Sequence, residues 1–119
     1  MAITTKTIKK SLQEIFGKKA IFDHPLSEVT TLRVGGPAQY FISAHNEEDL
    51  LGAIRFAEGH NLPFYLIGSA SNIVANDKGI RGVVIQHSIT TLEINKETKT
   101  CRVGAGYPLL DLIRTLNKQ

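Results

Sequence analysis

The residues best suited to chemistry form a loop of small side chains that directly follows an apolar run. Residues 62–67 are mostly apolar, and the next five are Gly68, Ser69, Ala70, Ser71 and Asn72. Small side chains after a buried strand allow backbone N–H groups to converge on an anion, and Ser71 and Asn72 could add side-chain donors. A pyrophosphate suits such a loop because its charge is spread over several oxygens. The loop matches neither of the two common glycine-rich phosphate motifs, so its composition leaves a purely structural turn open.

The remaining candidates for chemistry have simpler explanations. The spacing of Cys101 and the four histidines does not match that of metal ligands, so we expect no metal site. We expect the histidines to be solvated or to cap helices: His24, His45, His60 and His87. Cys101 is the only cysteine, which excludes an internal disulfide, and we expect it to be a small buried side chain. The loop lacks the G-x-S-x-G pattern that a serine nucleophile at Ser69 or Ser71 would need. We therefore assign no catalytic residue.

Three helices are expected to position the loop. Apolar spacing predicts the first over residues 7–16, with Gly17 as its stop. The second begins after the N-cap Asn46, carries acidic residues 47–49 in its first turn, and ends at Gly59. Pro108 opens the third. Its apolar face has little left to pack against: Leu109, Leu112, Ile113 and Leu116.

The strand pattern predicts a mixed α+β (α/β) fold. Residues 39–44 and 62–67 flank the second helix, which favours a parallel strand–helix–strand unit with a right-handed crossover. A third strand is expected over residues 82–86, and residues 22–38 resemble a loop. Residues 91–94 and 99–103 alternate apolar and polar side chains, which predicts an antiparallel hairpin with one solvated face.

The composition is that of one small soluble domain. The chain has 119 residues, of which 42% are hydrophobic and 21% charged. No targeting segment is visible, and no run approaches the roughly 20 apolar residues that span a bilayer, so a cytoplasmic location is expected. The net charge is +3, but the basic residues are scattered and no aromatic residues interleave with them. We therefore expect neither a nucleic acid nor a membrane as a partner.

Four segments, in order, resemble the UDP-N-acetylenolpyruvoylglucosamine reductase (MurB) family, whose members are also called UDP-N-acetylmuramate dehydrogenases. They are TTLRVGGPA at 30–38, LIGSASNIV at 66–74, DKGIRGVVI at 77–85 and VGAG at 103–106. The similarity covers residues 20–119. Four motifs in the correct order are far more specific than any one of them.

This resemblance implies a fold, a cofactor and a reaction. The fold is an N-terminal FAD-binding domain of the vanillyl-alcohol-oxidase/PCMH type, with a parallel subdomain followed by the start of an antiparallel one. In the family, NADPH reduces FAD, and the flavin passes a hydride to the enolpyruvyl group of a UDP-sugar. The product, UDP-N-acetylmuramate, is a precursor of peptidoglycan, the cell-wall polymer that maintains cell shape. The residues implied to hold the FAD pyrophosphate are Ile67, Gly68, Ser69, Ala70, Ser71 and Asn72. Gly35 and Gly36 are expected to shape the fold.

The loop departs from the family pattern at two positions. The family usually has glycine where this chain has Ala70, and glycine or glutamate where it has Ser69. A methyl group at Ala70 would weaken FAD binding only if that position needs a positive φ or a very close approach of phosphate.

We expect residues 1–19 to form an N-terminal helix and residues 20–119 a truncated FAD-binding domain without the substrate domain. In the family, that later domain supplies a serine proton donor and a glutamate, so the UDP-sugar would bind only with it. Flavin hydride transfer needs a positioned acid, so we expect this chain alone to be inactive, and whether it is an enzyme stays open. Two alternatives remain: a stand-alone nucleotide- or anion-binding module, and the FAD domain of another oxidoreductase of the same fold.

Overall fold

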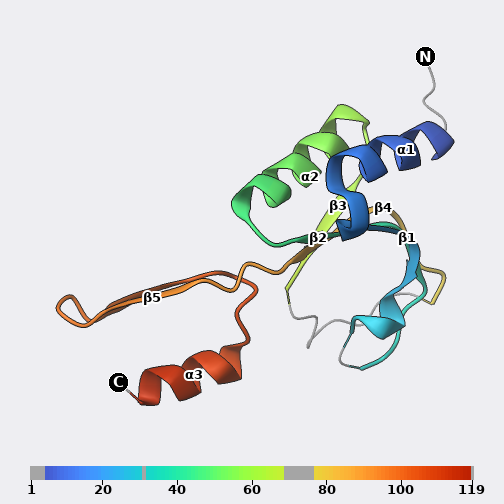
Figure 1. Ribbon diagram of the computed structural model, residues 1–119. Helices are drawn as coiled ribbons and strands as arrows, with labels where there is room; N and C mark the ends of the chain where they lie inside the picture. Colours follow the sequence, from blue (N-terminus) through green and yellow to red (C-terminus); the bar gives the residue numbers. More distant parts are fainter. Residues whose placement is uncertain (1–4, 31, 69–76, 119) are drawn as a thin grey trace.

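The described part of the protein consists of a four-stranded sheet with two α-helices on one face, and a hairpin and third α-helix that extend away from it (Figure 1). The computed structural model describes residues 5–30, 32–68 and 77–118. In this part of the chain the α-helices are α1 (Thr5–Phe16), α2 (Glu47–Gly59) and α3 (Leu109–Asn117), and short 3₁₀ helices η1 (Gly17–Lys19) and η2 (Leu26–Glu28) flank β1. The strands are β1 (Ala20–Pro25), β2 (Pro37–Ala44), β3 (Phe64–Ile67), β4 (Ile80–His87), β5 (Leu92–Asn95) and β6 (Thr100–Val103). The radius of gyration is 16.4 Å. A compact domain of this length would have about 13.5 Å, so the molecule is elongated.

Strand β4 lies in the interior of the sheet, which has the order β1-β2-β4-β3. Strands β2, β4 and β3 run parallel, and β1 is antiparallel to β2. The predicted strand–helix–strand unit is present, but β2 and β3 do not pair, because β4 lies between them. The physical reason is the composition of β4, whose residues Val83, Val84 and Ile85 are buried on both faces of the sheet. Such a continuous apolar run is stable only in an interior position.

Strand β1 corrects the prediction of a loop over residues 22–38. Residues Ala20 to Pro25 pair with β2, and side chains alternate between more and less buried along the strand. Pro25 fits because β1 is an edge strand and a proline there removes no ladder hydrogen bond. Pairing continues past the strand, where the amide of Leu26 donates to the carbonyl of Gly36 at 2.9 Å. The glycines and prolines of this stretch are typical of loops, so the local sequence pattern did not indicate the strand.

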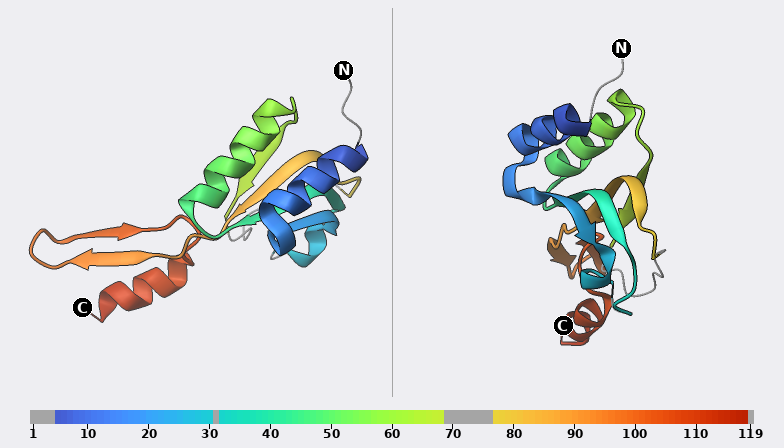
Figure 2. Two further views of the ribbon diagram at one scale, coloured as in Figure 1. Left: turned by 45° about the horizontal axis from the view of Figure 1, so that its top comes forward. Right: turned by 90° about the vertical axis from the view of Figure 1, so that its right-hand side faces the viewer.

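Helices α1 and α2 lie on the same face of the sheet and share one core (Figure 2). Leu12 of α1 is completely buried, as are Tyr40 and Ile42 of β2. The other buried members of this core are Ile8, Phe16, Ala20, Ala44, Ala53, Phe56, Ala57, Val83 and Ile85. Helix α1 therefore contributes to the stability of the sheet. The expected division of the chain into residues 1–19 and 20–119 stays a prediction.

The hairpin and α3 form the exposed arm of the molecule. Strands β5 and β6 pair antiparallel, as predicted, with Leu92 opposite Val103. No described residue of α3 is buried, and Leu109 and Leu110 are each about two-thirds exposed (68% and 67%). Cys101 of β6 is exposed too, so the expectation that it is buried is wrong. The reason is that a two-stranded sheet lacks the second layer that would bury its side chains.

None of the helices in the described ranges has both the length and the apolar character needed to cross a lipid bilayer.

The shared core gives a stability prediction for α1. Leu12→Ala should lower the free energy of unfolding by about 3 kcal/mol, because it removes a fully buried side chain and leaves a cavity. Ile15→Ala is the matched control on the same helix, since Ile15 is 59% exposed, and should cost less than about 0.5 kcal/mol. Urea unfolding followed by circular dichroism measures both. Equal losses in the two variants would show that α1 is not packed as described.

Candidate functional site

The carboxyl ends of the three parallel strands meet at one edge of the sheet, which we call the carboxyl edge. It is formed by Ala44 at the end of β2, His87 at the end of β4, and Ile67 at the end of β3. Helix α2 begins at this edge, and the chain leaves it toward the hairpin (Figure 1). Ligands of open parallel sheets usually bind at this edge, so it is the first place to look for a site.

Two of the predicted pyrophosphate-binding residues, Ile67 and Gly68, lie at the carboxyl edge. Ile67 pairs with Gln86 of β4. It packs against a second, smaller core on the face of the sheet opposite α1 and α2, formed by Leu26, Ala38, Phe41 and Val84. The carbonyl of Gly68 accepts a hydrogen bond from Nε2 of Gln86 at 3.5 Å. A Cβ atom built on Gly68 would lie 3.8 Å from the carbonyl oxygen of Ala105. The loop therefore starts against the VGAG segment. Ser69, Ala70, Ser71 and Asn72 lie outside the described residues, and their roles stay predictions.

The described chain resumes at Asp77, where it packs closely against the first motif. A Cβ atom on Gly36 would overlap the carbonyl oxygen of Asp77 and lie 2.5 Å from the backbone nitrogen of Gly79. Only glycine permits this backbone approach. Gly36 therefore shapes the fold, as expected, by joining the start of β2 to the turn that precedes β4.

A hollow of about 630 Å³ opens beside the carboxyl edge. Its walls are apolar where Leu50 and Leu51 of α2 face Val103 of β6, and charged at Glu47 and Arg102. His87, Gly104 and Ala105 also line it. Its volume is in the range of small-molecule sites, which combine apolar walls with a few polar groups.

His87 differs from the expectation that the histidines are solvated or capping. It is half-buried at the end of β4, and its Nδ1 is fully buried and has no hydrogen-bond partner among the described residues. A buried polar atom without a partner is rare, because desolvation costs free energy that a hydrogen bond would offset. Its apolar neighbours in β4 could have indicated this burial from the sequence.

The other histidines have structural explanations. Nδ1 of His60 lies 2.9 Å from the carbonyl oxygen of Phe56 at the end of α2, which confirms a capping role. His24 lies against the ring of Phe41, and His45 is exposed. In the described ranges, no three His, Cys, Asp or Glu side chains are placed to hold a metal ion.

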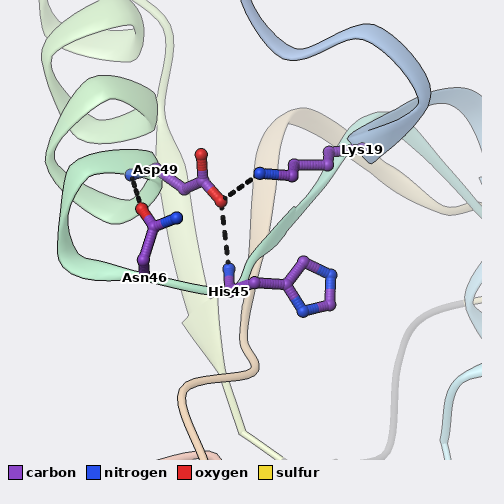
Figure 3. A network of polar contacts seen from close by, with 4 residues as sticks. All are labelled: Lys19, His45, Asn46 and Asp49. Atoms are coloured by element: carbon purple, nitrogen blue, oxygen red, sulfur yellow. Dashed lines mark hydrogen bonds and ion pairs between the residues drawn. The ribbon is translucent and has the colours of Figure 1, made fainter.

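A polar network fixes the start of α2 at the carboxyl edge (Figure 3). One oxygen of Asp49 accepts from Nζ of Lys19 at 2.8 Å and from the amide of His45 at 3.2 Å. The side chain of Asn46 accepts from the Asp49 amide at 2.7 Å, which confirms Asn46 as the N-cap. Burial raises the pKa of Asp49, but the hydrogen bonds from Lys19 and His45 outweigh it, so the pKa is below its ordinary value. The network joins three segments: the turn after α1, the end of β2 and the first turn of α2.

Comparison with known proteins defines the class. The sequence model of the FAD binding domain family matches residues 38–119. This chain belongs to that family, and FAD as the family's cofactor is confirmed.

The particular relatives are UDP-N-acetylenolpyruvoylglucosamine reductases. The one from Streptococcus agalactiae serotype III (strain NEM316) is 39% identical over 102 residues, which cover 85% of this chain and 33% of that protein. The one from Rubrobacter xylanophilus is 34% identical over 102 residues, or 84% of this chain. The crystal structure of the Thermus caldophilus reductase matches with a TM-score of 0.53 and 26% identity, and the match covers 83% of this chain and 32% of that one. The motif-based resemblance and the fold class are thereby confirmed. The chain spans about a third of the length of these relatives.

The Asp49 network predicts a dependence of stability on pH. The pKa of Asp49 is lower in the folded chain than the roughly 3.9 of an unfolded aspartate, so its stabilisation is present above that value and is lost as the pH falls through the folded pKa. Asp49→Asn should cost about 1 kcal/mol at pH 7, since the pair with Lys19 is partly solvent-screened, and less near pH 3.

The matched control is Asp111→Asn on α3. Asp111 is 57% exposed and lies 3.7 Å from Arg114, so this substitution should change stability by less than about 0.5 kcal/mol. Urea unfolding at pH 7 and near pH 3 measures both variants. A loss for Asp49→Asn that is the same at both pH values would contradict the role of the ionised carboxylate.

Proposed function

We propose that this chain is the FAD-binding part of a UDP-N-acetylenolpyruvoylglucosamine reductase and that it holds FAD at the carboxyl edge of its sheet. The match to the FAD binding domain family over residues 38–119 is the observation that carries the proposal. The names of the relatives favour this reductase over other oxidoreductases of the same fold.

The described residues fit a dinucleotide at this edge. Gly68 is half-buried just after β3, where the chain enters the loop that we propose binds the pyrophosphate, and it has no side chain to obstruct a ligand there. The hollow lined by α2, the hairpin and Ala105 has apolar walls, and His87, whose Nδ1 is buried, also lines it. These features suit a flat heteroaromatic ring better than a free inorganic anion.

The proposal assigns separate tasks to the parts of the site. Ile67 and Gly68 would begin the pyrophosphate loop, and Ser69, Ala70, Ser71 and Asn72 would supply backbone and side-chain donors to it. When bound, FAD would supply a flavin able to accept a hydride from NADPH and pass it to the enolpyruvyl group of the UDP-sugar. The reductase activity, NADPH and the UDP-sugar all belong to the proposal, because the chain spans only about a third of its relatives.

A titration of the chain with FAD tests the proposal, with flavin fluorescence as the signal. The wild-type chain should bind saturably. Asn72→Ala should weaken binding about tenfold or more, because a hydrogen bond to a charged phosphate contributes about 1.5–3 kcal/mol. Asn117→Ala is the matched control, since Asn117 is exposed at the end of α3, and should bind as the wild type does. Absence of saturable binding by the folded wild-type chain would contradict the proposal.

A further inference from the structure

The junction between the sheet and the hairpin is held by a short set of backbone hydrogen bonds. The chain leaves β4 through residues 88–91 and returns from β6 through residues 104–107. The amide of Gly104 donates to the carbonyl of Thr91, and that of Gly106 donates to the carbonyl of Ile89, both at 2.9 Å. The amide of Ser88 donates to the carbonyl of Ala44 at 2.8 Å, which ties the junction to the end of β2.

The two glycines of the VGAG segment permit this junction because neither has room for a side chain. A Cβ atom on Gly104 would overlap the carbonyl oxygen of Ile89 and lie 2.7 Å from its carbonyl carbon. A Cβ atom on Gly106 would overlap the carbonyl oxygen of His87 and lie 2.7 Å from Cα of Ser88. Any larger residue would push the two segments apart.

Ala105 lies between these glycines and faces the start of the pyrophosphate loop. Residues 104–107 form a tight turn, in which the amide of Tyr107 donates to the carbonyl of Gly104 at 3.0 Å. Ala105 is exposed, and its carbonyl oxygen lies 3.8 Å from the Cβ position of Gly68. Leu50 and Leu51 of α2 face the hairpin across the hollow. The backbone hydrogen bonds of the junction therefore fix the position of the turn that carries Ala105.

We propose that Gly104 and Gly106 are positioning residues of the cofactor site. They brace the hairpin and α3 against the carboxyl edge and hold Ala105 opposite Gly68, so that two separate segments form the two sides of the place where FAD binds. The proposal rests on the proposed function, because it assumes that FAD binds at Gly68.

A distance measurement tests the brace without any ligand. Cys101 is the sole cysteine and is exposed on β6, so one spin label can be attached there and a second at Glu58→Cys on α2. Pulsed electron paramagnetic resonance should give one narrow distance distribution for the otherwise wild-type chain. Gly104→Ala and Gly106→Ala should shift it or at least double its width.

Two glycine variants serve as controls for the distance measurement. In Gly82→Ala the new Cβ would overlap the carbonyl oxygen of Pro63 inside the four-stranded sheet, at a φ of +115° that strains the substitution further. In Gly59→Ala the new Cβ meets open space. Both should keep the wild-type distribution, and circular dichroism at the same temperature confirms that each variant is folded. An unchanged distribution in Gly106→Ala would overturn the brace.

The second readout is FAD affinity. Gly104→Ala and Gly106→Ala should weaken FAD binding about tenfold or more, while Gly59→Ala should bind as the wild type does. A changed distance distribution with unchanged FAD affinity would overturn the positioning role. If the wild-type chain itself binds no FAD, the proposed function fails, and the distance distributions still decide whether the brace exists.

If neither Gly104→Ala nor Gly106→Ala folds, amide hydrogen exchange of the wild-type chain still tests whether the brace exists. The brace predicts that the Gly104 and Gly106 amides exchange at least 100-fold more slowly than unprotected amides, because each donates to a backbone carbonyl. Exchange at the unprotected rate at both positions would overturn the proposal.

Discussion

The burial of the middle of β4 is the constraint on which the rest of the structure depends. Val83, Val84 and Ile85 are at most 1% exposed, so the strand must lie between two others and be covered on both faces. The α2 crossover therefore passes over β4 to reach β3, and all three carboxyl ends meet at one edge. The α1–α2 core covers one face of the strand, and the smaller core containing Ile67 covers the other. The meeting of the three carboxyl ends at one edge is thus a consequence of burying one apolar strand.

Local signals were sufficient to predict elements whose ends are marked by particular residues. Gly17, Asn46 and Pro108 mark the ends or starts of the three helices, and the alternation around residues 92–103 identified the hairpin. The sequence pattern did not predict strand β1, because this strand is defined by its pairing with β2, which lies further along the chain. The glycines and prolines where β1 ends and β2 begins are typical of a loop. The interior position of β4 was missed for the same kind of reason, since strand order is a property of the whole chain.

The sequence indicated the class of ligand and the protein family, but it did not indicate how the residues of the candidate site are arranged in space. The small residues of the loop suggested an anion, and four ordered motifs indicated the family, which the comparisons confirm. The close approach of Gly68 to Ala105 depends on segments far apart in the sequence. No spacing rule reveals such contacts, because they arise only when the hairpin returns to the edge from which it left.

The most direct test of the account is to map FAD onto the sheet by nuclear magnetic resonance. In a titration of the ¹⁵N-labelled chain, we expect the amide signals of Gly68, His87 and Ala105 to shift in proportion to one saturable binding event. The signals of Lys10 in α1 and Lys96 at the tip of the hairpin should stay fixed, since both are exposed and lie away from the carboxyl edge. Shifts that saturate on α1 or at the hairpin tip, with Gly68 and Ala105 unmoved, would contradict the claim that the carboxyl edge holds the cofactor.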